Sequence, residues 1–323
     1  MLTTVKTHAG PGPIPQAHRF PQGFPSSINI HSLLYHAHTG WLFICNDIKN
    51  VTPVGVLFAA LNASVAPLFS MGPALSPAQM IAALPPVLLW SWSNLFLFDL
   101  HNQRRGVGED ALNKPWRPLP SGRLSLEQAT LVIYCMYLIT FIITVKCGGL
   151  VPCLLESVFC LWYNEWAGSD NPFLKNFLNG LGIPCFFVGP LEVATGHSIF
   201  SGHGKMAAWI SIIAGSIAIT SHIQDFRDVE GDKASGRVTV PLVIGDTNAR
   251  LLATFGVGGF TAVSCWFWEV GWREGAPAWT AAAILVMNLF LNKTQKGDDL
   301  AWKKLWFLWM LGLFTLPLFV YHR

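Results

Sequence analysis

Long apolar stretches, separated by short polar or glycine- and proline-rich segments, dominate the chain after about residue 50. Most of them approach the roughly 20 residues that an α-helix needs to cross the ~30 Å hydrocarbon core of a bilayer. Their hydropathy and boundaries predict nine membrane-spanning helices, near residues 51–71, 80–100, 125–145, 147–166, 173–195, 205–224, 250–271, 276–292 and 301–320. We therefore expect an all-α integral membrane protein, with a mobile lead-in over residues 1–40 and a single nine-helix domain over residues 41–323.

Composition agrees with this pattern, because 52% of the residues are hydrophobic and only 12% are charged, about half of the roughly 25% typical of soluble domains. The first residues lack the apolar core of a secretory signal, so we expect no cleaved signal peptide. The net charge of +3, without a basic patch interleaved with aromatic residues, argues against nucleic-acid binding. The seven cysteines are scattered without a CxxC pair, which argues against a zinc site or a disulfide framework.

The distribution of Lys and Arg predicts the orientation of the helices. With nine spans, the N-terminus and the long polar loops share one face of the membrane, and seventeen of the 21 basic residues fall on it. The opposite face keeps Lys146, Lys205, Arg273 and Arg323. Because basic loops stay in the cytoplasm, the N-terminus and the polar loops are predicted to be cytoplasmic.

Residues 224–237 gather three aspartates directly after the sixth apolar stretch, in a chain that otherwise avoids charge. On an α-helix, Asp225, Asp228 and Asp232 fall within an arc of about 60° on one face. Three carboxylates on one face repel each other unless a cation lies between them. Oxygen ligands without His or Cys favour Mg²⁺, which proteins hold with one or two carboxylates plus substrate phosphates. The alternative is a solvated helix end with ordinary charges.

Basic residues accompany this cluster and also a similar segment that follows the second predicted helix. Both segments have acidic residues at a helix end and then a basic, proline-containing loop, which predicts two related halves facing one central cavity that opens to the cytoplasm. Arg binds phosphate oxygens with a bidentate fork and Lys binds them as a point charge, so a diphosphate substrate is favoured. The candidate ligands are Lys114, Arg117, Lys233 and Arg237. For Arg104, Arg105 and Arg123, phosphate binding and a role in setting the membrane topology are equally good interpretations.

These two segments resemble the aspartate-rich motifs of the UbiA superfamily of intramembrane prenyltransferases, which lie on the second and sixth of nine helices. The second motif of that family, DxxDxxxD, is complete at Asp225, Asp228 and Asp232, and the family's RPLPSG stretch is present at residues 117–122. The resemblance spans nearly the whole hydrophobic region. It implies Mg²⁺ as cofactor, a prenyl diphosphate as substrate, and catalysis that depends on Asp225 and Asp228.

The first family motif, NDxxDxxxD, is altered in this chain. Counting back from the RPLPSG stretch places Asn102, Gln103, Gly106 and Asp110 at the four motif positions, so two of three expected aspartates are missing. The candidate metal ligands here are Asn102 and Asp110. Asp99, one helical turn before Asn102, is a further candidate that could supply a missing carboxylate, and Glu109 is another.

The resemblance also implies that a Tyr and a Lys near the end of the fourth helix contact substrate, and Tyr163 and Lys175 are the nearest matches. Aromatic faces can stabilise an allylic carbocation by cation–π attraction. The predicted lining of that cation pocket is Trp92, Asn94, Phe96 and Trp162. Because Trp also gathers at membrane interfaces, an interfacial position is the alternative for each Trp.

Together these features predict an enzyme that ionises a prenyl diphosphate, farnesyl diphosphate by resemblance, in a cavity within the membrane. The altered first motif resembles that of the fungal membrane terpene cyclases of the family, so the predicted outcome is intramolecular cyclisation to a sesquiterpene. The alternative is transfer of the prenyl group to an aromatic or other acceptor, and a multi-pass transporter is a more distant one. The resemblance implies the endoplasmic reticulum as location, and no oligomeric state is predicted.

Overall fold

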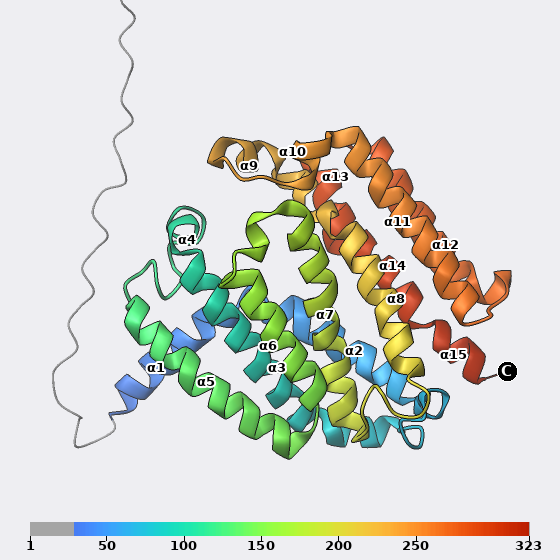
Figure 1. Cartoon of the computed structure of the whole chain (residues 1–323), viewed down its shortest axis with the longest axis horizontal. Helices are drawn as coiled ribbons and strands as arrows, with labels where there is room; N and C mark the ends of the chain where they lie inside the picture. The colour runs from blue at the N-terminus through green and yellow to red at the C-terminus, as the bar shows by residue number, and fades with distance from the viewer. Residues whose placement is uncertain (1–28, 323) are drawn as a thin grey trace, which may run out of the picture.

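The computed structural model describes residues 29–322, and this part of the chain is all-helical, without β-strands (Figure 1). The longer helices are α1 (Ile30–Ile44), α2 (Ile48–Ala63), α3 (Pro77–Arg105), α5 (Leu126–Cys147), α6 (Leu150–Asn164), α7 (Pro172–Thr195), α8 (Lys205–Thr220), α11 (Asp246–Phe267) and α12 (Trp272–Leu291). The shorter ones are α4 (Val107–Asn113), α9 (Val229–Ser235), α10 (Val240–Ile244), α13 (Gln295–Leu300), α14 (Phe307–Phe314) and α15 (Leu316–Tyr321). Short 3₁₀ segments are η1 (Ala66–Phe69), η2 (Gly168–Asp170) and η3 (Ser221–Asp228), and a π-helical segment, η4 (Ala301–Trp306), joins α13 to α14.

Seven helical segments within residues 29–322 are long and apolar enough to cross a membrane. An eighth span results if α1 and α2, which meet at a bend of 71°, are counted as one broken span. The predicted span 147–166 corresponds to α6, which is apolar but has only 15 residues, about 22 Å at 1.5 Å per residue and short of the ~30 Å core. The structure therefore shows an all-helical fold with seven or eight candidate spans, and the count of nine stays a prediction.

The N-terminal prediction needs a correction, because helix begins within the segment predicted as a lead-in. The side chain of Asn29 caps α1 by accepting a hydrogen bond from the backbone N–H of His31. Phe43 then anchors α1 on α3 through an edge-to-face contact with Phe96, whose ring centroid is 5.7 Å away. Residues 30–40 are therefore helical, and residues 1–28 of the predicted lead-in lie outside the described residues.

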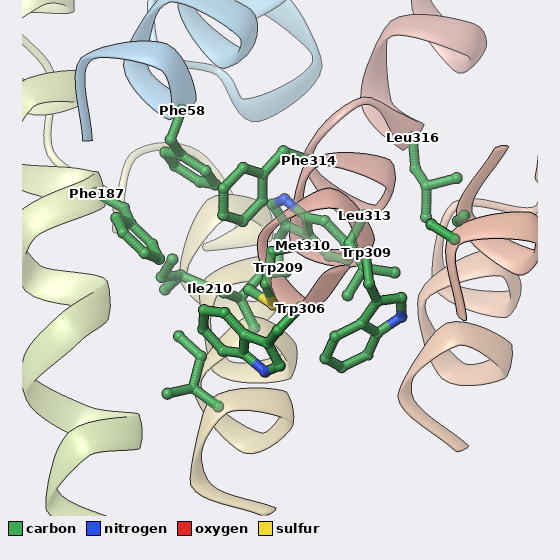
Figure 2. Packing of buried hydrophobic residues seen from close by; sticks show 14 of the residues in the cluster. Phe58, Phe187, Trp209, Ile210, Trp306, Trp309, Met310, Leu313, Phe314 and Leu316 are labelled. Carbon is green, nitrogen blue, oxygen red and sulfur yellow. The ribbon is translucent and has the colours of Figure 1, made fainter. Parts of the chain in front are cut away.

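The largest buried cluster lies between α2, α7, α8, α11, α12 and α14. Figure 2 shows Phe58, Phe187 and Phe314 packed together, with ring centroids 5.0–5.6 Å apart, and the indole of Trp209 nearby. Gly180 lets α7 approach α8, since an added Cβ would lie 2.6 Å from the backbone oxygen of Ala214. Such small residues permit the close packing that holds helices together in lipid.

The two motif segments lie at the same end of the helix bundle. Figure 1 shows α4, which carries Asp110 of the first motif, at the upper left, and α9, which carries Asp232 of the second motif, at the upper edge with α10 and α13. The ends of α3 and α6 and the start of α7 reach toward the same edge. Residues that are more than 100 positions apart in sequence therefore converge there, as the two-halves prediction requires.

Candidate active site

A cavity of about 2280 Å³ opens between the two motif segments and extends among α2, α3, α6 and α7. Its polar end is lined by η3, α9, α4 and the basic loop that follows α4, and its deeper walls include Leu95, Phe159 and Phe186. The cavity thus joins a charged mouth to an apolar interior. This is the distribution that a molecule with one charged end and one apolar end requires.

The first part of the second motif is not α-helical. The prediction had placed all three of its aspartates on one face of an α-helix. Ser221–Asp228 form a 3₁₀ helix, and Asp228 leaves the helical region with φ −110° and ψ 5° before α9 begins. Because a 3₁₀ helix has three residues per turn, the side chains of Asp225 and Asp228 lie on the same face of η3. Asp232 follows on α9, and all three aspartates line the cavity.

Asp225 is the most buried aspartate of this motif and has a cationic partner from another helix. Lys175, near the start of α7, donates from Nζ to Asp225 Oδ1 at 3.1 Å, and both side chains are buried. The structure therefore brings together two residues that the sequence separates by 50 positions. Because each charge offsets the cost of burying the other, the pair holds a lysine ammonium beside the motif.

Asp228 and Asp232 also have basic neighbours. Arg227 Nε contacts Asp228 Oδ2 at 3.1 Å, and Arg227 Nη1 donates to Asp299 Oδ1 at 2.9 Å. Arg237 Nη1 lies 3.7 Å from Asp232 Oδ1 and 3.5 Å from Glu109 Oε1 on α4. Arg237 therefore connects the second motif segment to the first, across the mouth of the cavity.

The first motif is divided by a helix end. Helix α3 ends at Arg105, and Gly106 is its C-cap residue. Gln103, at a position where the family has an aspartate, is buried and donates from Nε2 to the backbone oxygen of Phe43 at 2.7 Å. Gln103 does not line the cavity. Its amide holds the end of α1 against α3, so the missing aspartate has been replaced by a structural contact.

Asp110 and Arg117 form a buried ion pair, through a single guanidinium nitrogen, within the loop that contains α4. Arg117 Nη1 donates to both carboxylate oxygens of Asp110, at 2.9 and 2.8 Å. Arg117 Nη2 also lies 3.8 Å from Asp47 Oδ2. Asp110 and Arg117, both predicted site residues, line the cavity together with Lys114. In this arrangement Asp110 orients Arg117.

Asp47 is a residue of this region that the sequence analysis missed. It precedes α2, lines the cavity, and lies within hydrogen-bonding reach of Asp99, one of whose oxygens is buried without a hydrogen-bond partner. Asp99 itself is only 1% exposed and is not part of the cavity lining. A lone acidic residue 52 positions before Asp99 gave no signal in the sequence, because only the fold brings it to α3.

Asn102 is the predicted metal ligand of α3 that faces the cavity. Its side chain donates from Nδ2 to Asn164 Oδ1 on α6 at 3.3 Å. On α3, Leu95, Phe98 and Asn102 share the cavity-lining face at spacings of three and four residues. This face determines which residues of the predicted cation pocket can meet a substrate.

The predicted cation pocket is misplaced, because its four members do not line the cavity. Trp92 and Phe96 stack on each other with ring centroids 5.5 Å apart, on a different face of α3. Asn94 is fully buried and donates to the backbone oxygen of Trp90, and Trp162 lies outside the lining on α6. Counting aromatic residues could not distinguish helix faces, and the lining aromatics from these helices and α7 are instead Phe98, Phe159, Tyr163 and Phe186.

Tyr163 does line the cavity, and its ring packs at 6.0 Å from that of Phe98. Arg237 and Asp225 are near enough to act on its hydroxyl electrostatically. Lys233, in contrast, is exposed on α9 and is not part of the lining. Of the predicted basic ligands, the structure therefore gathers Lys114, Arg117, Lys175 and Arg237 at the cavity.

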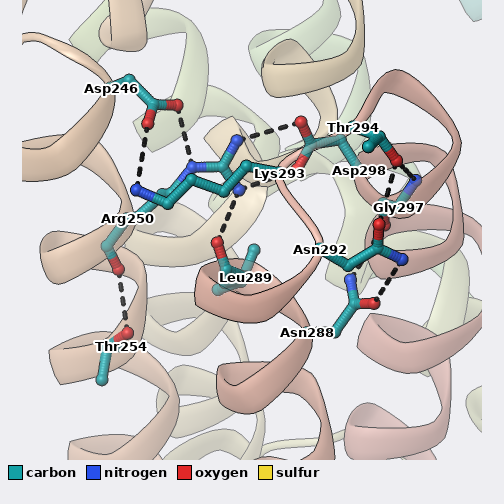
Figure 3. Close-up of polar contacts among 10 residues, drawn as sticks. All are labelled: Asp246, Arg250, Thr254, Asn288, Leu289, Asn292, Lys293, Thr294, Gly297 and Asp298. Carbon is teal, nitrogen blue, oxygen red and sulfur yellow. Dashed lines mark hydrogen bonds and ion pairs between the residues drawn. The ribbon is translucent and has the colours of Figure 1, made fainter.

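A buried polar cluster near the mouth was also missed (Figure 3). Arg250, on α11, donates to Asp298 with two nitrogens at 2.8 and 2.9 Å, to Asp246 Oδ1 at 2.8 Å, and to the backbone oxygen of Leu289 at 2.8 Å. Its guanidinium also lies 4.3 Å from the ring centroid of Phe226 in η3. In the sequence, Arg250 is one of the seventeen basic residues on the predicted cytoplasmic face, and its spacing of four from Asp246 was a visible signal of an ion pair.

The oxygen donors at the mouth fit the way in which proteins hold Mg²⁺. Asp225, Asp228 and Asp232 line one cavity, and Asp99 keeps an orphaned oxygen next to Asp47. Among residues 29–322 there is no group of three or more His, Cys, Asp or Glu side chains arranged to hold a metal by themselves.

Comparison with known proteins identifies the class to which this fold and site belong. The model of the UbiA prenyltransferase family matches residues 51–312, so the chain belongs to the UbiA prenyltransferase family. The family expected from the two motifs is thereby confirmed. The chain is a membrane enzyme, either a UbiA-type terpene cyclase or a prenyltransferase.

Two relatives and one solved structure show where the chain stands within the family. It is 32% identical over 238 residues to fumagillin beta-trans-bergamotene synthase of Aspergillus fumigatus, covering 72% of this chain and 79% of that protein. It is 30% identical over 275 residues to somaliensene A/B synthase of Streptomyces somaliensis, covering 81% and 86%. The fold is similar to that of a UbiA homolog from Archaeoglobus fulgidus bound to GPP and Mg²⁺, with a TM-score of 0.56 and 14% identity over 85% of this chain and 99% of that one.

Proposed function

We propose that this protein catalyses the Mg²⁺-dependent ionisation of farnesyl diphosphate in its membrane-embedded cavity, followed by intramolecular cyclisation to a sesquiterpene. The observation that carries this proposal is the shape and charge of the cavity. Three aspartates and several basic residues line its mouth, and apolar and aromatic side chains line its interior. A diphosphate headgroup and a prenyl chain match these two parts.

Asp225, Asp228 and Asp232 are the residues that would hold Mg²⁺, with Asn102 and Asp110 opposite them and Asp99 nearby. Bound Mg²⁺ supplies neutralisation of the negative charge that develops on the leaving diphosphate. When the substrate binds, the carboxylate of Asp225 would leave Lys175 and contact the substrate complex. The ammonium of Lys175 would then be free to bind a phosphate oxygen. The GPP- and Mg²⁺-bound structure of the Archaeoglobus homolog supports this assignment at the level of the fold.

The diphosphate is bound by Arg117, Lys114, Lys175 and Arg237, all of which line the cavity. Arg117 presents a guanidinium that Asp110 holds in a fixed orientation, which suits bidentate binding of phosphate oxygens. Lys233, predicted as a further ligand, is assigned at most a long-range electrostatic role because it lies outside the lining. These cations stabilise the leaving group in the transition state more than in the bound substrate.

The aromatic residues of the deeper wall stabilise the carbocation that remains after the diphosphate leaves. Phe98, Phe159 and Phe186 present rings to the cavity, and the hydroxyl-bearing ring of Tyr163 lies between them and the charged mouth. The negative faces of such rings attract a cation. The surrounding apolar walls exclude water, which would otherwise quench the cation to an alcohol.

Prenyl transfer to an aromatic or other acceptor is the second candidate function, because the family as a whole is described by that reaction. Cyclisation is placed first because the relatives reported above are named for terpene products and because the first motif is altered. A transporter function is not proposed, since the comparisons identify an enzyme. We place the enzyme in the endoplasmic reticulum membrane, with the cavity mouth on the cytoplasmic side and the bilayer as the source of its substrate.

The deciding experiment incubates protein purified in nanodiscs with farnesyl diphosphate, with Mg²⁺ or with EDTA, and without an acceptor. The expected result is Mg²⁺-dependent release of diphosphate together with a cyclic hydrocarbon detected by gas chromatography and mass spectrometry. A product that forms only when a phenolic acceptor is added would establish transfer instead. No release of diphosphate from farnesyl, geranyl or geranylgeranyl diphosphate would refute both candidates.

A further inference from the structure

Glu156 is a buried carboxyl group to which the proposed reaction has so far given no role. It lies on α6, it is only 1% exposed, and neither of its carboxyl oxygens has a hydrogen-bond partner among the described residues. Glu192, a buried glutamate on α7, instead accepts a hydrogen bond from the backbone N–H of Ile199 at 2.7 Å. Burying a carboxyl without a partner costs free energy, and such residues within membrane helices generally mark functional sites.

The position of Glu156 is in the deeper wall of the cavity. Glu156, Cys160 and Tyr163 line the cavity from one face of α6, at spacings of four and three residues. Seven residues separate Glu156 from Tyr163, about 10 Å along the helix axis. Since Tyr163 lies near Asp225 and Arg237 at the charged mouth, Glu156 is well removed from the diphosphate end.

Among residues 29–322, no charged group compensates the buried carboxyl group of Glu156. Cys153, Cys160 and Cys185 lie close enough for its charge to act on them, and thiols are weak hydrogen-bond partners. Cys153 belongs to a buried apolar cluster that includes Leu95 and Phe186. The carboxyl group therefore faces an apolar environment in which a cation would be its best partner.

We infer that Glu156 contacts the carbocation in the apolar part of the cavity and accepts the proton that ends the reaction. This inference rests on the proposed function, because that reaction supplies the cation. Glu156 is part of the wall of this cavity. As the closest anion in the deeper wall, Glu156 also determines where positive charge accumulates and hence which double bond forms.

The carboxylate removes a proton from a carbon next to the cationic carbon, and the electron pair of the broken C–H bond becomes the second bond of a new alkene. The products are a neutral hydrocarbon and a neutral carboxylic acid. The carboxylic acid then passes its proton, through water that enters from the mouth of the cavity, to the diphosphate that the reaction has released, and this restores the carboxylate.

Product analysis of Glu156→Gln, with Glu156→Asp and Glu192→Gln alongside, tests the inference. Gln keeps the size of the side chain but cannot accept the proton, so the amount of the wild-type hydrocarbon per diphosphate released should fall at least fivefold. Acyclic alkenes and alcohols should replace it. Glu156→Asp should restore part of the wild-type profile, and Glu192→Gln should leave the profile unchanged. An unchanged profile in Glu156→Gln would overturn the inference.

Thermal unfolding distinguishes a catalytic from a structural role. Because Glu156 has no hydrogen-bond partner to lose, Glu156→Leu should unfold at the same temperature as the wild type or at a higher one, while its products change. Glu192→Leu removes an acceptor that Ile199 uses, so it should unfold at a lower temperature. Destabilisation of Glu156→Leu with an unchanged product profile would assign Glu156 to the structure.

Binding of a stable cation separates this inference from the proposed function. A farnesyl chain that carries a protonated tertiary amine serves as the carbocation probe, and the same chain with an ether oxygen serves as the neutral probe. Glu156→Gln should bind the ammonium probe at least tenfold more weakly and the neutral probe equally well. If the wild type releases no diphosphate, this difference still supports a cation site. Equal binding of the ammonium probe to both proteins would overturn the inference whatever the activity.

Discussion

The two motif segments have the same sequence plan, but the fold uses their residues differently. In the second segment, Asp225, Asp228 and Asp232 all line the cavity. In the first, Gln103 holds α1 through the backbone oxygen of Phe43, and Asp110 holds Arg117. The carboxylates of the second segment are therefore available to the substrate complex, whereas the first segment has been converted largely into a support for a cation.

This difference shows how one half of a two-motif enzyme can lose aspartates and keep a defined structure. Where an aspartate is missing, at Gln103, a neutral amide satisfies a backbone oxygen at 2.7 Å and replaces a metal ligand with an interhelical hydrogen bond. Two carboxylates outside the motif positions lie near the first segment: Asp99, earlier on α3, and Asp47, which precedes α2. The comparison thus predicts unequal contributions of the two segments to metal binding.

The largest expected effect is on the second segment. Asp225→Asn and Asp228→Asn should each reduce diphosphate release at least a thousandfold, about 4 kcal/mol in activation free energy, because each removes a proposed Mg²⁺ ligand. Asp299→Asn is the matched control, since Asp299 also pairs with Arg227 but does not line the cavity, and it should stay within threefold of the wild type. Near wild-type rates in both motif variants would remove the second segment from the mechanism.

The next effect concerns the stability of the first segment. Arg117→Ala should lower the free energy of unfolding by about 3 kcal/mol, because it leaves Asp110 buried without its partner. Thermal unfolding in detergent measures this loss. The double variant Arg117→Ala with Asp110→Ala should recover part of the lost stability. A loss in the double variant equal to the sum of the losses in the two single variants would contradict a coupled pair.

A smaller effect is expected for the carboxylates that approach the first segment from other positions. Asp99→Asn and Asp47→Asn should each raise the Mg²⁺ concentration for half-maximal diphosphate release by roughly tenfold, about 1.4 kcal/mol. The reason is that Asp47 lines the cavity and that Asp99, on α3, lies within hydrogen-bonding reach of Asp47. A Mg²⁺ requirement equal to that of the wild type in both variants would exclude them from the metal site.

The smallest effect is expected at Gln103. Gln103→Leu should destabilise the protein by about 1 kcal/mol, since the backbone oxygen of Phe43 loses its donor. Gln103→Asp restores the family's aspartate, yet it should not lower the Mg²⁺ requirement, because this side chain does not line the cavity. A lower Mg²⁺ requirement in Gln103→Asp would show that the position can still reach the metal.

Much of this architecture was visible in the sequence, for identifiable physical reasons. Apolar length predicts membrane helices because the bilayer fixes the span, and the short α6 marks the limit of that rule. The second motif was recognised from its spacing, although η3 is a 3₁₀ helix rather than the expected α-helix. Lys175, which the family resemblance suggested as a substrate contact, pairs with Asp225 in the structure, and its contact with the substrate stays a prediction.

The remaining features depend on contacts between distant segments. Asp47 reaches Asp99 only because α1 and α2 bend by 71° beside α3. Trp92 and Phe96 were assigned to the cation pocket by residue type, whereas the rotation of α3 presents Leu95 and Phe98 instead. Local spacing constrains neighbours on one helix, but it does not fix the rotation of that helix within the bundle.

The most direct test of the unequal roles of the two segments is the Mg²⁺ dependence of diphosphate release by Asp228→Asn and Asp110→Asn, measured side by side in nanodiscs at saturating farnesyl diphosphate. Asp228→Asn should raise the Mg²⁺ concentration for half-maximal release at least tenfold. Asp110→Asn, which loses an ion pair with Arg117 rather than a principal metal ligand, should change it less than threefold. Equal shifts in the two variants would contradict the account.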